Sequence, residues 1–235
     1  MGGGRVVPGD RALRAVQGEL GIIRAASRRT PVRTLRLSPP ERAAIGLAIA
    51  LLALHALAPG DALEYQRSAI ARQPWRVLTG HLVHINWPHA LINAAALWIV
   101  ARLYAPDLSA TRQAIALAAS ALAISASLAW LHPDIEWYRG LSGALHGLFF
   151  AGAAKWLLAE RPRSLGRLWM PALLLLGGWV KVVFEQQGAG ALPRADWLGA
   201  AVVPQAHLAG AACGTVLGAL FAAAKARAGE QRDEQ

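Results

Sequence analysis

The sequence has almost no cysteine, since Cys213 is the single one in 235 residues, and a fold held together by disulfides is therefore excluded. Charged residues are also scarce, at 16% of the chain against about 25% in soluble domains. Hydrophobic residues make up 55%, which excludes a disordered chain, because disordered chains carry few apolar side chains. This composition predicts a membrane protein with several spans.

Acidic residues are fewer than basic ones, with 14 Asp and Glu against 24 Lys and Arg, and the net charge is +10. Nine arginines but three acidic residues lie in 1–42, before the first apolar run. Aromatic residues are not interleaved with these charges, so we expect no nucleic-acid binding and instead attraction to anionic membrane lipids. Within this basic arm, residues 11–25 form either an amphipathic surface helix or part of a disordered segment.

Stretches free of Asp, Glu, Lys and Arg predict the membrane spans, because a helix needs about 20 apolar residues to cross the hydrocarbon core. The fourth and fifth stretches reach that length by continuing past Lys155 to Ala159 and past Lys181 to Phe184. The expected fold is an all-α membrane protein with a basic arm (1–42), a six-helix core (43–224) and a short charged tail (225–235). The six stretches are 43–60, 77–101, 113–133, 140–154, 168–180 and 197–224.

The distribution of lysine and arginine predicts the orientation of this core. If the N-terminus is cytoplasmic, the inner segments hold 18 of these residues and the outer loops hold five, with Lys181 inside a span. Cytoplasmic loops carry the excess of positive charge in membrane proteins. Both termini are therefore expected on the cytoplasmic side.

Polar side chains inside the predicted spans are candidates for function, since they are costly to place in a membrane. Ser142 and His207 each lie 17 residues before the inner end of their spans, and His89 lies 16 residues before Ala105. At 1.5 Å per residue, all three lie roughly 25 Å above the inner boundary. A serine and two histidines are thus predicted to share one layer in the outer part of the membrane.

Small residues beside this layer predict close helix packing. Gly143 and Gly147 form a GxxxG pair on the fourth helix, and Ala206, Gly210, Gly214 and Gly218 form a ridge on the sixth. If the two sets face each other, Ser142 comes within hydrogen-bond reach of His207. Histidine can then act as the base that serine needs to become a nucleophile.

We expect a Ser–His dyad and not a triad, because the predicted spans contain no acidic residue at this height. Donors for the developing oxyanion are expected from the Ser142 N–H group and from the side chains of His89 and Asn93.

Four motifs in the same order resemble the rhomboid family of intramembrane serine proteases. They are Trp75-Arg76, then His84, His89 and Asn93 in HxxxxHxxxN, then GxSG at 140–143, and AHxxGxxxG from Ala206 to Gly214. The resemblance covers residues 43–224. It implies that Ser142 is the nucleophile, that His207 is the base, and that His89 and Asn93 lie on the oxyanion side.

The stretches GLSGALHG (140–147) and KVVFEQ (181–186) are similar to the rhombosortase subgroup. That resemblance implies a bacterial inner-membrane enzyme whose site opens outward and processes anchors with a C-terminal Gly-Gly signal. Many rhomboids have tyrosine where this chain has His146, one turn after the serine, and we expect His146 to line the site with Gly140 and Gly143. Lys181 and Glu185 are expected to form a local ion pair, with gating or substrate contact as alternatives.

Several alternatives remain open from the sequence. An intramembrane serine can serve only in helix packing, a buried histidine can be structural, and His89 and Asn93 can act in helix capping. A membrane metalloenzyme would use His81, His84 and His89, although such enzymes gather ligands from several helices. A transporter or a non-catalytic binder is a further alternative, and a general rhomboid protease is the alternative within the family. No cofactor or metal is expected.

Overall fold

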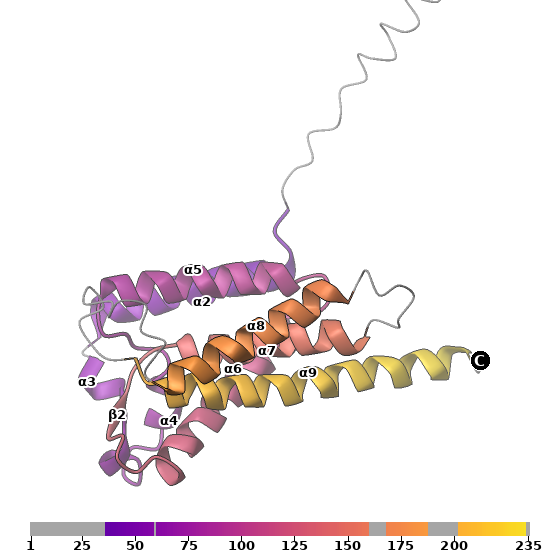
Figure 1. The fold of residues 1–235 in the computed structure, drawn as a ribbon. Coiled ribbons are helices and arrows are strands. Elements are labelled where there is room, and N and C mark those ends of the chain that lie inside the picture. Colours follow the sequence, from indigo (N-terminus) through magenta and orange to yellow (C-terminus); the bar gives the residue numbers. More distant parts are fainter. Residues whose placement is uncertain (1–35, 59, 160–167, 188–201, 234–235) are drawn as a thin grey trace, which may run out of the picture. The chain divides into compact units, whose positions relative to one another are not determined.

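The computed structural model describes residues 36–58, 60–159, 168–187 and 202–233. The possible amphipathic helix at 11–25 and the first five residues of the predicted sixth span lie outside this part. Within it, six helices have 18 residues or more and occupy the predicted places (Figure 1). They are α2 (Pro39–Leu57), α5 (Trp87–Tyr104), α6 (Ala110–Trp130), α7 (Ser142–Ala159), α8 (Trp169–Gln186) and α9 (Pro204–Asp233).

Three of these helices are long and apolar enough to cross a membrane: α2, α6 and the part of α9 from Pro204 to Ala224. Short elements connect the first helices on the side where α7 and α9 begin. They are α3 (Gly60–Leu63), β1 (Tyr65–Gln66), the 3-10 helix η1 (Arg67–Ala69), α4 (Arg76–Thr79) and β2 (Trp137–Tyr138). The strands β1 and β2 pair antiparallel through Tyr65 and Tyr138. This pairing was not predicted, because strands of two residues carry no readable pattern.

The predicted second span, 77–101, is wrong at its start. Residues 76–79 form the separate helix α4, and α5 begins only at Trp87. Asn86 caps α5, since its side-chain oxygen accepts a hydrogen bond from the His89 N–H group at 2.9 Å. Pro88 suits the first turn, where its missing N–H group is not needed. A charge-free stretch cannot reveal such a break.

Helices α7 and α9 pack through the predicted glycine ridges. A Cβ atom added at Gly143 would lie 2.9 Å from the carbonyl oxygen of Ala206, and one added at Gly218 would lie 2.5 Å from that of Ala151. Gly210 and Gly214 abut the backbone of Gly143 and Gly147 in the same way. These positions have no room for a side chain, because the two backbones are in direct contact, as expected for small-residue ridges.

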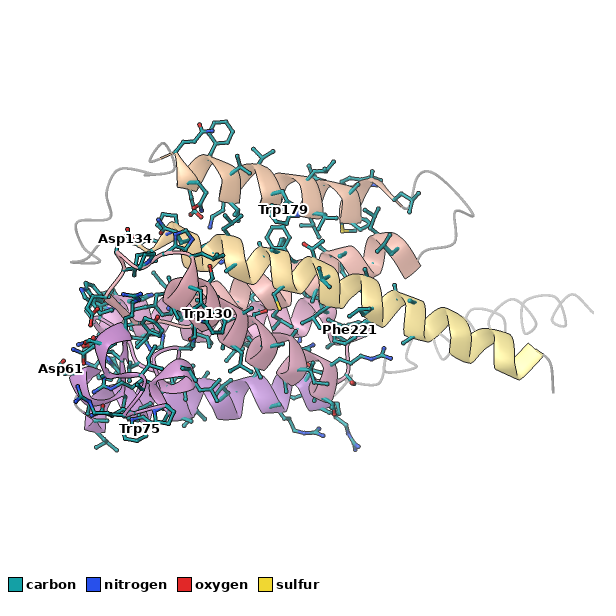
Figure 2. All side chains as sticks on the ribbon, turned by 90° about the horizontal axis from the view of Figure 1, so that it is seen from below. Asp61, Trp75, Trp130, Asp134, Trp179 and Phe221 are labelled. Atoms are coloured by element: carbon teal, nitrogen blue, oxygen red, sulfur yellow. The ribbon has the colours of Figure 1, made fainter. Side chains whose placement is uncertain are left out.

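The other end of α7 is attached to the connection between α5 and α6. The Lys155 ammonium is 2% exposed and donates a hydrogen bond to the carbonyl oxygen of Asp107 at 2.6 Å. The Trp156 indole donates to the Asp107 carboxylate at 2.5 Å. Figure 2 shows Asp61 and Asp134 at the end of the helices where α9 starts, and Phe221 farther along α9. The site below lies at the end marked by the two aspartates.

Candidate active site

Ser142 is the first residue of α7, and the turn before it depends on a glycine. Gly140 has φ +124°, a conformation that residues with a side chain rarely adopt. A Cβ atom at this position would also lie 2.6 Å from Cε1 of His89. The Tyr138 hydroxyl donates to the Gly140 carbonyl at 2.7 Å, and the Gly140 N–H group donates to Gly80 at 3.0 Å. These contacts fix the position of the serine at the start of the helix.

His207 lies in the first turn of α9 and faces Ser142. Its Nε2 atom is 3.0 Å from the Ser142 hydroxyl oxygen, a hydrogen-bond distance. The histidine is 5% exposed, so this contact is largely shielded. The structure thus confirms the predicted meeting of serine and histidine beside the glycine ridges.

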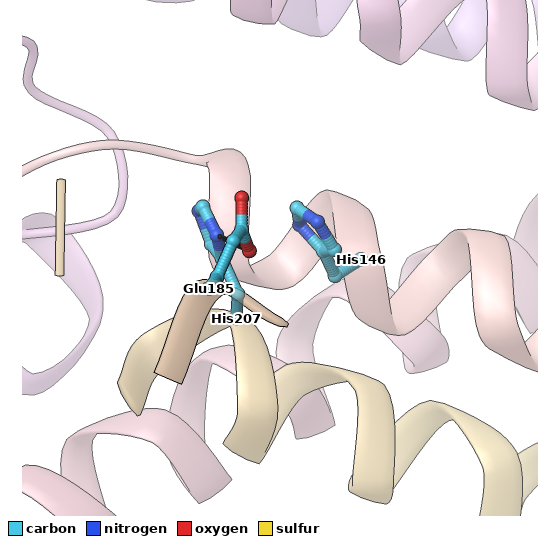
Figure 3. A group of neighbouring side chains, drawn as sticks. All are labelled: His146, Glu185 and His207. Carbon is cyan, nitrogen blue, oxygen red and sulfur yellow. Dashed lines mark hydrogen bonds and ion pairs between the residues drawn. The ribbon is translucent and has the colours of Figure 1, made fainter. Parts of the chain in front are cut away.

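The expectation that no acidic residue reaches this histidine was wrong. Glu185 on α8 has its Oε2 atom 3.0 Å from Nδ1 of His207 (Figure 3). The sequence placed Glu185 one residue beyond the end of the fifth span, but α8 continues through Gln186 and lies beside the start of α9. The acidic side chain therefore reaches the same layer as the serine.

Lys181 and Glu185 form the predicted ion pair, with 2.8 Å between Nζ and Oε1. The pair is not only local, because Lys181 Nζ also lies 2.6 Å from Nε2 of His146. His146 in turn bonds the Ser142 carbonyl through Nδ1 at 2.8 Å. Its ring stacks on the ring of His207, with centroids 4.1 Å apart and planes 19° apart. His146 therefore faces the site, as expected.

Serine, both histidines, the glutamate and the lysine together close a ring of contacts across three helices. In order, the ring runs through Ser142, His207, Glu185, Lys181 and His146 and returns to the Ser142 carbonyl. We call this set the polar ring. Each ionisable group of the polar ring has a partner within it, which is what such groups require within a membrane.

A cavity of about 160 Å³ opens beside Ser142 and His207. His89 and Asn93 from α5 line it together with apolar residues. The Asn93 amide donates to the His89 carbonyl at 3.1 Å, while Nδ1 of His89 is buried without a hydrogen-bond partner in the described part of the chain. The remaining lining residues are Ile85, Ile92, Trp137, Tyr138, Arg139, Val202 and Val203.

Charged residues lie beside Arg139, which is one of the residues that line this cavity. Arg139 bonds Glu64 and Asp61, each at 2.6 Å. Burial disfavours the charged guanidinium, but the hydrogen bonds to these two carboxylates prevail and raise the pKa of Arg139. Nearby, hydrogen bonds from the Ser68 hydroxyl and N–H groups lower the pKa of Glu136. The loops are thus held together by the ion pairs of Arg139 and the hydrogen bonds of Glu136.

Metal-ligating atoms meet at one point among the residues that the structure describes. One atom each of His146, Glu185 and His207 lies within 4.8 Å of the others. The Lys181 ammonium already bonds two of these residues and would have to move for a cation to bind. His81, His84 and His89 form no such group in the described part of the chain, and Nε2 of His81 lies 3.1 Å from the Ser125 hydroxyl.

Within the polar ring, the sequence analysis missed the contact of Glu185 with His207 and that of Lys181 with His146. A signal was present, because Lys181 and Glu185 are four residues apart and thus share one face of a helix near its end. Charged residues on one face of a membrane helix usually point toward the bundle interior. Applied to Glu185, this rule predicts that the carboxylate points toward Ser142 and His207.

Comparison with protein families matches the Rhomboid domain over residues 71–224, which is most of the chain. Comparison with curated proteins gave no significant match. The matched range includes every residue of the polar ring, the cavity residues His89 and Asn93, and the contacting glycines of α7 and α9. The chain therefore belongs to the rhomboid family of intramembrane serine proteases.

Proposed function

We propose that Ser142 is the nucleophile and His207 the general base of this protease. The observation that carries the proposal is the 3.0 Å contact between the Ser142 hydroxyl and Nε2 of His207. A serine hydroxyl is a weak nucleophile at neutral pH unless a base takes its proton during attack. A histidine at hydrogen-bond distance is suited to that role.

The tetrahedral intermediate also needs hydrogen-bond donors for its oxyanion. The Ser142 N–H group lies at the start of α7, where backbone N–H groups have no partner within the helix. We assign His89 and Asn93 to the same side, because both line the cavity beside the serine. Donors that are already in place act where charge develops and need no rearrangement during the reaction.

The substrate class follows from the depth and the size of the site. We assign six membrane crossings with both termini cytoplasmic, which puts the serine near the outer surface. A peptide bond within a membrane helix is shielded by hydrogen bonds, so the substrate must unwind near its outer end. Glycine lowers the barrier to unwinding, and small residues suit a cavity of about 160 Å³. Single-pass anchors with small residues at that level are the expected substrates.

We assign the enzyme to the rhombosortase subgroup, in the inner membrane of a bacterium. The sequence stretches GLSGALHG and KVVFEQ support this assignment, as does His146, which stacks on His207 in place of the tyrosine of many rhomboids. The substrates are then exported proteins with a C-terminal Gly-Gly signal, a hydrophobic helix and a basic tail. Cleavage releases the outer domain from the membrane lipids, and no nucleic acid takes part.

Co-expression with candidate substrates tests this proposal. An exported protein with a Gly-Gly anchor is produced with the wild type, with Ser142→Ala, or with neither, and mass spectrometry identifies its new C-terminus. We expect cleavage by the wild type alone, at or just before the Gly-Gly pair. Replacing Gly-Gly by Leu-Leu should block processing. Equal cleavage of the Leu-Leu anchor would reject the subgroup and leave a general rhomboid protease.

A further inference from the structure

Among the residues that the structure describes, Glu185 is the one acidic group that contacts the histidine assigned as the base. Its two carboxylate oxygens have different partners: Oε2 meets Nδ1 of His207 at 3.0 Å, and Oε1 meets the Lys181 ammonium at 2.8 Å. The Glu185 side chain is 15% exposed and that of His207 is 7% exposed. A carboxylate held by a cation on one side and a histidine on the other has little freedom to turn away.

The partners of each histidine determine which ring nitrogen carries the proton. The carboxylate can only accept, so Nδ1 of His207 donates and its Nε2 atom is left with a lone pair facing the Ser142 hydroxyl. This is the tautomer that can accept the serine proton. His146 follows the same rule, because Nδ1 donates to the Ser142 carbonyl and Nε2 accepts from Lys181. The whole polar ring is therefore consistent with one arrangement of protons.

We propose that Glu185 is a positioning residue that completes a Ser–His–Glu triad, with its acidic member on α8. This inference rests on the proposed roles of Ser142 and His207. Glu185 holds His207 in the tautomer required for catalysis and stabilises the imidazolium that forms during attack. Lys181 orients the carboxylate and balances its charge.

The reaction then proceeds with the proton accounted for at each step. As Ser142 Oγ bonds to the carbonyl carbon, its proton moves to Nε2 of His207, and the imidazolium is paired with Glu185. The proton passes to the leaving nitrogen as the C–N bond breaks, which leaves an acyl-enzyme. Water attacks this ester with His207 again as base, and the serine regains its proton as the acid product leaves.

Within the polar ring, Glu185 is the anionic partner of His207, because His146 contributes only a stacking contact to that histidine. His146 bonds Lys181, so the ammonium is shared between a carboxylate and a neutral imidazole. The cavity side of His207 is lined by His89, which carries no negative charge. Removal of the Glu185 charge should therefore affect the histidine directly, while leaving the stacking contact at 4.1 Å intact.

Two substitutions of Glu185 test the charge of the side chain separately from its size. Glu185→Gln keeps the size of the side chain but loses its charge, and its amide can donate to Nδ1 and so favour the wrong tautomer of His207. Glu185→Asp keeps the charge on a shorter side chain. Kinetics of the purified full-length enzyme, measured on a single-pass model substrate, should show kcat lowered at least about a hundredfold in the Gln variant with KM nearly unchanged. The Asp variant should retain more activity than the Gln variant.

The controls distinguish failure of this inference from failure of the proposed function. Asp134→Asn makes the same change from carboxylate to amide at an exposed loop position on the same side of the molecule, and should leave kcat unchanged. Thermal unfolding of each variant reports whether it is folded. If Ser142→Ala is inactive but Glu185→Gln keeps wild-type kcat, or if Gln retains more activity than Asp, the triad is rejected and the dyad stands. If Ser142→Ala remains active, the proposed nucleophile itself is wrong.

Discussion

The two ends of the α7–α9 pair differ in what holds them together. At the end with the polar ring, side chains meet: Ser142 bonds His207, and α8 joins them through Glu185. Farther along, only backbones meet, because Gly147 abuts Gly214 and no side chain separates the helices. The first end needs particular functional groups in addition to small residues, whereas the rest of the pair needs small residues alone. Loss of a functional group should therefore affect activity more than stability.

The glycine contacts also set the geometry of the polar ring. The hydrogen bond between Ser142 and His207 forms where the backbones of the two helices are in direct contact. The contact of Gly143 with Ala206 lies one residue from each partner of that hydrogen bond. A separation at this point would thus remove the hydrogen bond even if both side chains were intact.

The largest expected effect comes from removing the reacting groups. Ser142→Ala and His207→Ala should each abolish proteolysis, since loss of the nucleophile or the base in serine proteases lowers kcat by roughly a millionfold. Thermal unfolding should change little, because the glycine contacts remain. Measurable turnover by either variant would contradict the assigned roles, and a collapse of stability would contradict the separation of the two ends.

A side chain at the contacting glycines should instead lower stability. In Gly214→Ala the new Cβ would lie 2.7 Å from the carbonyl carbon of Gly147, so the backbones must separate. We expect the free energy of unfolding to fall by about 1–3 kcal/mol, the usual range for overpacking. Gly177→Ala on α8 is the matched control, because its Cβ would have nothing within 4 Å. Equal unfolding temperatures for the two variants would show that the ridge does not control stability.

The cavity residues should show a smaller effect, confined to catalysis. His89→Ala and Asn93→Ala should each lower kcat on the order of a hundredfold and raise KM little, since an oxyanion forms only in the transition state. Steady-state kinetics on one model substrate separates the two parameters. If KM alone changes, these residues position the substrate and do not stabilise the oxyanion.

The smallest effect is expected at Glu136, in the loop between α6 and α7. Hydrogen bonds from Ser68 lower the pKa of Glu136, so its value in the folded protein is below that in the unfolded chain. The resulting stabilisation is present above the unfolded value and is lost as the pH falls through the folded value. Glu136→Gln should therefore flatten the decline of stability below about pH 4. An unchanged decline would show that this carboxylate contributes nothing.

Much of the fold could be predicted from the sequence, since long apolar stretches free of charge correspond closely to helices. The boundaries at α5 and the β1–β2 pairing could not, because a cap at Asn86 and a pair of two-residue strands leave no trace in hydrophobicity. Ser142 and His207 were predictable from their equal heights and adjacent glycines. The contact of Glu185 with His207 was missed, because counting residues gives the height of a side chain but not the distance that it reaches across the gap between helices.

The contacts of Asp107 with Lys155 and Trp156 give the end of α7 opposite Ser142 a fixed reference point. Ser142 lies 13 residues from Lys155, which is about 20 Å along the helix. Since the rise per residue of a helix is fixed, the number of residues between Lys155 and Ser142 determines the depth of the hydroxyl. Inserting one residue would move the hydroxyl by about 1.5 Å along the helix axis and turn it by about 100°, away from His207. A change in the length of this segment therefore cannot be absorbed.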